Sequence, residues 1–218
     1  MIKAIVFDFD GVIIDSEKIW LDAKIKALKK NKIKLKKNTN FNSYIGISSR
    51  IFFKKFIPKK NYINTINNVN QSYNHLLEKE FSKIPKLNKG ILNILKLPNL
   101  KFCIVSNNSK DFILKSLKSH NILKYFEKKF IIALRKTKLR KPLPYGYLEI
   151  LKKLNCKPNE IIVIEDSSTG IKAAKKARIK YIFKYSQFKL KQIKSYINIL
   201  SLTSFKKNYN NIIINCRS

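Results

Sequence analysis

The chain has 218 residues, of which 44% are hydrophobic, so it is long enough to bury a sizeable core and too apolar for a disordered protein. Its formal net charge of +34, from 47 lysine and arginine residues against 13 aspartate and glutamate residues, would attract nucleic acid or anionic membranes. Lysine, asparagine and isoleucine are abundant together along the chain and have codons rich in A and T, so we interpret the charge as a drift of base composition and give the few acidic residues more weight.

The first predicted element is a strand at residues 2–7, because this short apolar run ends in aspartate and glycine, as buried parallel strands often do. From Ser16, which can cap a helix, apolar residues recur at helical spacing. Two further helical stretches follow, at about residues 48–57 and 62–82. The segment 16–82 is therefore expected to be mainly helical, with no strand.

After Pro85 the sequence predicts a helix at residues 87–97, and from there strands and helices alternate. The predicted strands are residues 101–105, 129–133, 161–165 and 180–184, and the predicted helices are residues 109–119, 144–154 and 168–177. This alternation predicts an α/β fold with a Rossmann-like, doubly wound parallel sheet and helices on both faces. We expect a catalytic core of residues 1–15 and 83–218 with an inserted helical cap domain of residues 16–82, and we assign no role to the tail after about residue 200.

The three cysteines, Cys103, Cys156 and Cys216, include no CxxC pair. This pattern disfavours a disulfide framework or a zinc site and favours a reducing cytoplasm. We expect no signal peptide before the first strand, and no apolar run of the sequence approaches the length of a membrane span. The sequence therefore predicts a soluble cytoplasmic protein with no membrane partner, and we expect a monomer.

Polar residues follow several predicted strands, and in an open α/β sheet ligands bind beyond the carboxyl ends of the strands. The residues concerned are Asp8 and Asp10 after the first strand, Ser106 and Asn107 after the strand 101–105, Lys141 in the loop before helix 144–154, and Glu165 with Asp166 at the end of the strand 161–165. Carboxylates that converge at one rim would repel one another unless a cation lay among them. Ligands made only of oxygen suit Mg²⁺.

These residue types suit phosphoryl transfer. Asp8, an ionised carboxylate fixed at a strand end, can attack phosphorus and form an aspartyl-phosphate. Asp10 can give a proton to the leaving oxygen and later take one from the attacking water. Ser106 can bind the phosphoryl oxygens, and Lys141 can neutralise both the nucleophile and the transferring group.

Four motifs, DFDGVIIDSE, VSNNS, RKPLPYGY and VIEDSSTGIKAA, resemble in order and spacing those of the haloacid dehalogenase-like hydrolase superfamily. The similarity extends to about residue 185 and is greatest to capped sugar-phosphate phosphatases and β-phosphoglucomutase-like members, and residues 98–183 are also similar to the 6-phosphogluconate phosphatase type. The resemblance implies that Asp8 is the nucleophile and Asp10 the acid and base, while Ser106 and Lys141 hold the phosphate.

The same resemblance implies a divalent cation, Mg²⁺ or another such as Mn²⁺. Its ligands would be Asp8, the carbonyl group of Asp10 and Asp166, with Glu165 assisting. The expected function is therefore Mg²⁺-dependent hydrolysis of a small phosphomonoester through an aspartyl-phosphate intermediate, and the expected substrate is a sugar phosphate. The expected partner is a small phosphorylated metabolite.

The cap segment YIGISSR carries Gly46 and Arg50, where related enzymes have residues that contact substrate. Arginine suits bidentate recognition of oxyanions, so we expect Arg50, together with Asn107, to bind the substrate. Two positions depart from the family pattern: Tyr145 replaces a frequent acidic residue, and Arg178 replaces a glycine. A glycine ends a helix at low cost, so Arg178 is expected to strain that turn.

Three other functions are left open by the residues. A phosphomutase would use the same core residues, and only its products would separate it from a phosphatase. A haloacid dehalogenase has less support, because Asp10 and the metal-binding carboxylates would have no use in dehalogenation. A basic nucleic-acid-binding protein without enzymatic activity rests on charge alone, and no aromatic-basic recognition motif accompanies it, so no specific nucleic acid partner is expected.

Overall fold

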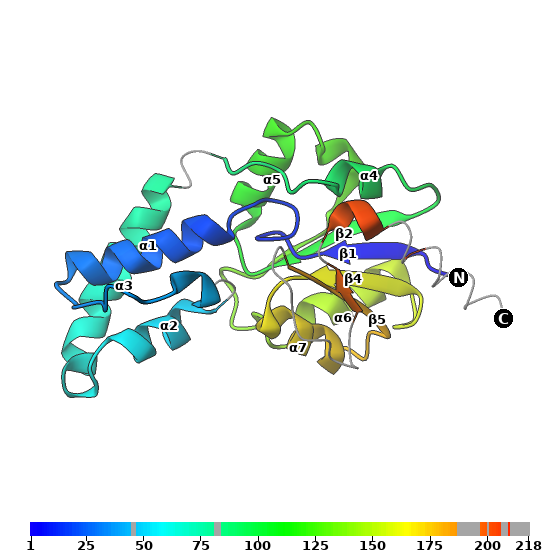
Figure 1. The fold of residues 1–218 in the computed structure, drawn as a ribbon. Coiled ribbons are helices and arrows are strands. Elements are labelled where there is room, and N and C mark those ends of the chain that lie inside the picture. The colour runs from blue at the N-terminus through cyan, green and yellow to red at the C-terminus, as the bar shows by residue number, and fades with distance from the viewer. Residues whose placement is uncertain (45–46, 81–83, 187–196, 200, 206–208, 210–218) are drawn as a thin grey trace. The chain divides into compact units, whose positions relative to one another are not determined.

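A computed structural model of the chain describes residues 1–44, 47–80, 84–186, 197–199, 201–205 and 209 (Figure 1). The chain divides into two compact units: a core unit of Met1–Asp15 with Lys86–Ser218, and a cap unit of Ser16–Pro85. The predicted boundary between residues 82 and 83 lies outside the described residues. Among the described helices, none is both long enough and apolar enough to cross a membrane.

Six parallel strands of the described chain form the sheet of the core unit, in the spatial order β3-β2-β1-β4-β5-β6. They are β1 (Ala4–Phe7), β2 (Lys101–Ser106), β3 (Phe126–Ala133), β4 (Ile161–Glu165), β5 (Tyr181–Tyr185) and β6 (Ile197–Ile199). All four residues of β1 are fully buried, as expected for a strand covered on both faces. The chain winds outward from β1 in both directions, so the topological switch point lies between β1 and β4.

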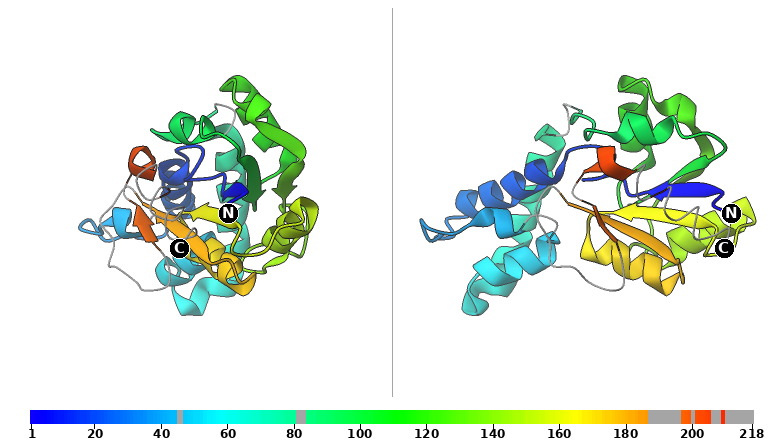
Figure 2. Two further views of the ribbon diagram at one scale, coloured as in Figure 1. Left: turned by 90° about the vertical axis from the view of Figure 1, so that its right-hand side faces the viewer. Right: turned by 45° about the vertical axis from the view of Figure 1, so that its right-hand side comes forward.

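Helices cover both faces of this sheet, which confirms the predicted α/β fold. They are α4 (Ile91–Leu95), α5 (Lys110–Ser119), α6 (Tyr145–Leu154) and α7 (Ser168–Lys176). Figure 1 and Figure 2 show α4 and α5 on one face and α6 and α7 on the other. Side chains alternate accordingly: Ile5 of β1 packs in a cluster with Ile113 of α5, whereas Val6 packs in a cluster with Ile150 of α6 and Ile171 of α7.

Three details of the core differ from the sequence-based expectation. The predicted helix 87–97 is helical only over α4, because the main chain of Lys86 and Leu87 pairs with Asp15 and Ile14 and is extended there. The strand predicted at 129–133 begins at Phe126, since its exposed charged residues hide the strand pattern. Strand β6 was not predicted, because three residues are too few to give a periodic signal.

Arg178 adopts a left-handed backbone conformation with φ 60°, so the strain expected where the family has glycine is present. In the tail after residue 200, Phe205 is fully buried, and its ring centroid lies 5.2 Å from that of Phe183. This part of the tail therefore contributes to the core, a role that the sequence did not reveal.

The cap unit is helical, as predicted. Its helices are α1 (Glu17–Lys30), α2 (Ser49–Phe56) and α3 (Tyr62–Glu80), and single 3₁₀ turns occupy Phe41–Tyr44 and Lys59–Asn61. An apolar cluster of its own, which includes Leu28, Phe52, Phe53, Val69 and Tyr73, holds the three helices together. Ser48 caps α2, since its Oγ accepts a hydrogen bond from the N–H of Ile51 at 3.5 Å.

Candidate active site

The first two aspartates of the site, Asp8 and Asp10, come directly after the central strand β1. The N–H of Asp8 donates to the carbonyl O of Ile164 at 2.9 Å, so strand pairing still fixes the main chain at Asp8. Directly after Asp10, Gly11 takes a left-handed conformation with φ 78° and turns the chain away from the sheet. The side-chain amide of buried Asn88 donates to the carbonyl O of Gly11 at 2.8 Å and thereby holds this turn.

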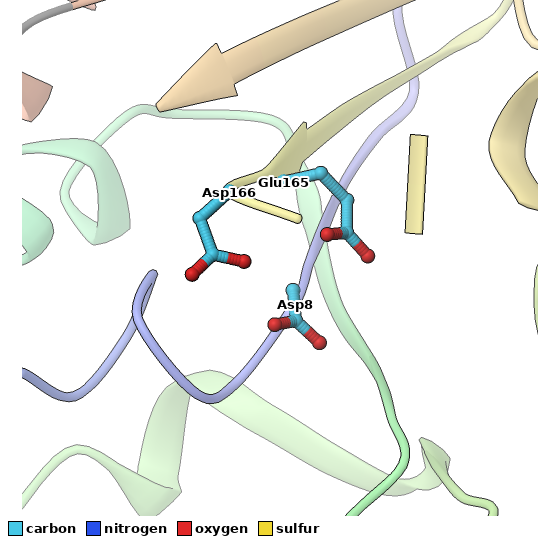
Figure 3. A group of neighbouring side chains, drawn as sticks. All are labelled: Asp8, Glu165 and Asp166. Carbon is cyan, nitrogen blue, oxygen red and sulfur yellow. The ribbon is translucent and has the colours of Figure 1, made fainter. Parts of the chain in front are cut away.

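Three carboxylates gather at the carboxyl ends of β1 and β4. Asp8, Glu165 and Asp166 each place an oxygen so that the three oxygens lie within 4.8 Å of one another (Figure 3). Asp8 is 8% exposed and Glu165 is fully buried. The structure therefore brings together three of the four acidic residues that sequence reasoning placed at this edge of the sheet, and the carboxylate of the fourth, Asp10, is not part of this group.

Lys141 joins two of these carboxylates. Its Nζ donates to Oδ1 of Asp8 at 2.7 Å and to Oε1 of Glu165 at 2.5 Å, and the side chain is almost completely buried. Asn107 holds the main chain of Lys141, because its Oδ1 accepts from the Lys141 N–H at 2.9 Å and its Nδ2 donates to the Lys141 carbonyl O at 3.4 Å. The predicted contact of Asn107 with substrate stays a prediction.

The charges in this cluster strongly perturb one another. Burial raises the pKa of Asp8 well above its usual range; the ammonium of Lys141 opposes this rise, and the charges of Glu165 and Asp10 add to it. Burial opposes the charge of Lys141, but the carboxylates of Asp8 and Glu165 outweigh this effect and raise the Lys141 pKa. Lys141 is therefore a permanent cation in a site of carboxylates.

Glu165 is held by donors from three directions. Its Oε1 accepts from Lys141 and from the hydroxyl of Tyr147 at 2.7 Å, and its Oε2 accepts from Oγ of Ser167 at 3.1 Å. The carboxyl group also fills the space beside Gly170: a Cβ atom built on Gly170 would lie 1.8 to 2.1 Å from three of its atoms. The carboxyl group of Glu165 is therefore fixed in a position in which it holds Lys141 in place.

Tyr147 was missed by the sequence reasoning, although it lies in the motif RKPLPYGY. It is fully buried on α6, and besides its hydrogen bond to Glu165 its ring centroid lies 5.4 Å from Nζ of Lys141. The available signal was the general tendency of a buried tyrosine hydroxyl to find a partner.

Residues after β2 support the second aspartate. Ser106 is fully buried, and its Oγ accepts from the N–H of Asn108 at 3.0 Å. The Nδ2 of Asn108 donates to both carboxylate oxygens of Asp10, at 3.1 and 3.3 Å. Asn108, which sequence reasoning also missed, thus positions Asp10 beside the end of β2; the second asparagine of VSNNS was the only signal.

The donor set suits a divalent cation. Asp8 and Asp166 offer carboxylate oxygens from adjacent strand ends, and such oxygens are the ligands that Mg²⁺ prefers. Glu165 belongs to the same group, but its oxygens already accept hydrogen bonds from Lys141, Tyr147 and Ser167. A cation among these carboxylates would also offset the repulsion between them.

Arg50 lies in the other unit. It stands in the first turn of α2 and is exposed, and its contact with substrate stays a prediction. Gly46, the other cap residue with an expected role, lies outside the described residues.

Proteins of known family have sequences similar to that of this chain. A family model described as "Haloacid dehalogenase-like hydrolase" matches residues 5–184. A phosphorylated carbohydrates phosphatase of Thermotoga maritima is 26% identical over 184 residues, which cover 83% of this chain and 84% of the relative.

Two solved structures have the same fold. The crystal structure of β-phosphoglucomutase from Clostridium difficile superposes with a TM-score of 0.68 at 26% identity and covers 98% of this chain and 100% of that chain. A conserved haloacid dehalogenase-like protein from Agrobacterium tumefaciens superposes with a TM-score of 0.79 at 18% identity and covers 98% of this chain and 100% of that chain.

Proposed function

The chain belongs to the haloacid dehalogenase-like hydrolase family, as an enzyme of the phosphoric monoester hydrolase class, and we propose that it hydrolyses a small sugar phosphate through an aspartyl-phosphate intermediate. The observation that carries this proposal is the buried bridge of Lys141 between Asp8 and Glu165 at the end of the central strand. The bridge puts a fixed cation beside Asp8, where it opposes the effect of burial on the Asp8 pKa and favours the ionised carboxylate that attack on phosphorus requires.

The proposed reaction has two displacements at phosphorus. A carboxylate oxygen of Asp8 attacks phosphorus, the bond from phosphorus to the sugar oxygen breaks, and the Asp10 carboxylic acid gives its proton to that oxygen. Water then attacks the phosphorus, Asp10 takes a proton from this water, and the bond to Asp8 breaks to release phosphate. Asn108 keeps the Asp10 carboxyl group in place through both steps, because it donates to both of its oxygens.

The other residues stabilise charge. Lys141 neutralises Asp8 and the transferring phosphoryl group, and Ser106 with nearby main-chain N–H groups binds the phosphoryl oxygens. Asp8, the Asp10 carbonyl and Asp166 would hold Mg²⁺ or a similar divalent cation such as Mn²⁺, with Glu165 assisting through Lys141. When bound, the cation would supply positive charge against the phosphate oxygens.

The substrate class is supported by the relatives, since one is named a phosphatase of phosphorylated carbohydrates. Arg50 of the cap unit is proposed to contact the organic part of that substrate. A phosphomutase of the β-phosphoglucomutase type is the second candidate, because the Clostridium difficile enzyme aligns along almost the whole chain at 26% identity. Both candidates use the same core residues, so their products decide between them.

The test is a panel of phosphate esters: glucose 6-phosphate, β-glucose 1-phosphate, ribose 5-phosphate, 6-phosphogluconate and p-nitrophenyl phosphate, with and without Mg²⁺. We expect Mg²⁺-dependent release of inorganic phosphate and its loss to background in Asp8→Asn, whereas Asp111→Asn, an exposed residue at the start of α5, should keep full activity. Conversion of β-glucose 1-phosphate into glucose 6-phosphate without phosphate release would identify the mutase. Substantial turnover by Asp8→Asn would refute the aspartyl-phosphate mechanism.

A further inference from the structure

Lys24 is a buried lysine that the proposed chemistry does not use. It lies on α1 in the cap unit and is only 4% exposed. Lysine is rarely buried without a partner, because it is costly to remove an ammonium group from water. Its presence inside an apolar cluster therefore needs an explanation.

The surroundings of Lys24 supply one main-chain acceptor and one aromatic ring. Its Nζ donates to the carbonyl O of Ile47 at 2.5 Å and lies 5.8 Å from the ring centroid of Phe52. Among the described residues, no carboxylate forms an ion pair with it. Burial lowers the pKa of Lys24 to about 8, and the charge of Glu17, on the same helix, opposes this shift only in part.

Ile47 is the residue from which the main chain enters α2. Its N–H donates to the carbonyl O of Tyr44 at 3.2 Å, and the next residue, Ser48, is the helix cap. The Lys24 ammonium therefore binds the main chain one residue before the cap. Arg50 stands in the first turn that follows, so a shift of Ile47 would displace Arg50.

We propose that Lys24 is a positioning residue for substrate recognition: its ammonium group fixes the main chain at Ile47 and, through it, the first turn of α2 with Arg50. The proposal rests on the proposed function, in which Arg50 contacts the substrate. Methionine has a similar length and would fill this space without a buried charge. Lysine here therefore lowers stability and supplies a charge-assisted hydrogen bond, a combination that is typical of functional positions.

The test compares Lys24→Met with the wild type and with Lys29→Met, a matched control on an exposed position of the same helix. We measure amide hydrogen exchange over residues 48–53, the midpoint of denaturation, and kcat/KM for p-nitrophenyl phosphate and for the sugar phosphate of the panel that the wild type hydrolyses best. In Lys24→Met we expect exchange over 48–53 to be about tenfold faster, although the midpoint is equal to or above that of the wild type. We expect kcat/KM to fall about tenfold, through KM, on the sugar phosphate alone.

Unchanged exchange over residues 48–53 would overturn the proposal. Equal losses on both esters would overturn it too, because they would indicate a role in the fold. If Lys24→Met does not fold, Lys24→Leu, which also removes the donor to Ile47, is judged by the same outcomes. Hydrogen exchange needs no substrate, so a wild type that hydrolyses no ester of the panel refutes the proposed function, while exchange still decides whether Lys24 anchors Ile47.

Discussion

Gly170→Ala is the substitution whose effect the structure defines most sharply. The new Cβ atom would lie 1.8 to 2.1 Å from three carboxyl atoms of Glu165, whereas real Cβ contacts stay above 3.0 Å. The carboxyl group must therefore move by about 1 Å in a close-packed interior. Its hydrogen bonds to Lys141, at 2.5 Å, and to Tyr147, at 2.7 Å, would then be stretched to the limit of hydrogen bonding.

Both stability and activity should fall. A buried ion pair that loses one partner costs about 3–5 kcal/mol, so a displaced partner should lower the free energy of unfolding by roughly half of that or more. A misplacement of about 1 Å in a catalytic group costs on the order of 100-fold in rate, which is the loss of kcat/KM expected when Lys141 shifts beside Asp8.

The assay combines denaturant unfolding with kcat/KM under conditions in which the variant is still folded. Lys172→Ala, on an exposed position of the same helix, controls for a general effect on α7 and should change neither quantity by much. A Gly170→Ala variant with wild-type stability and activity would refute the reasoning. Lower stability with unchanged kcat/KM would show that Glu165 supports the fold without positioning Lys141.

Three further predictions concern single side chains, and one concerns the overall charge. Tyr147→Phe removes one donor to Glu165 and keeps the ring, so kcat/KM should fall about tenfold while the circular dichroism spectrum is unchanged. Asn108→Leu leaves Asp10 without this amide donor, and steady-state kinetics should show kcat reduced about tenfold at nearly constant KM. Burial lowers the pKa of Lys24 to about 8, so the unfolded chain binds this proton more tightly; relative to Lys24→Met, the free energy of unfolding from denaturant titrations should rise by about 3 kcal/mol between roughly pH 8 and pH 10.5. Duplex DNA should bind weakly and lose affinity steeply with salt in a fluorescence titration, because counterion release alone would drive binding; sequence-selective binding at physiological salt would contradict our interpretation of the charge.

The position of most candidate site residues could be predicted, because it follows from strand ends alone. Asp8 directly follows one short apolar run, Glu165 and Asp166 follow another, and parallel strands bring their carboxyl ends to the same edge of the sheet. Lys141 is harder, since only the prolines after it distinguish it from the other lysines. Its two carboxylate partners lie 133 and 24 residues away in the chain. Over such separations, only the resemblance to a family could indicate that Lys141 belongs to the same site.

The supporting residues could not be predicted, because their roles depend on where each side chain points. No spacing rule says that the hydroxyl of Tyr147 is directed at Glu165. Nor does the sequence say which asparagine of VSNNS meets Asp10: it is Asn108, whereas Asn107 is bonded to the main chain of Lys141. The same limit applies to residues 87–88, which were predicted to be helical but instead pair with the distant residues 13 and 14.

Two lysines of this very basic chain differ from the others because they are buried, a property that cannot be read from the sequence. Among the described residues, Lys24 and Lys141 are the lysines that are buried, and their environments shift the pKa in opposite directions. Two carboxylates hold the charge of Lys141 and raise its pKa, so Lys141 is a cation at neutral pH, as a partner of phosphate must be. Lys24 has the carbonyl group of Ile47, the ring of Phe52 and the charge of Glu17 near it, but among the described residues it has no ion pair, so its proton is lost more readily. An apolar side chain at this position would avoid the cost of burying a charge and would make the fold more stable. The presence of lysine therefore implies that its hydrogen bond to Ile47 matters more than this added stability. This is the physical basis for assigning Lys24 to the positioning of α2.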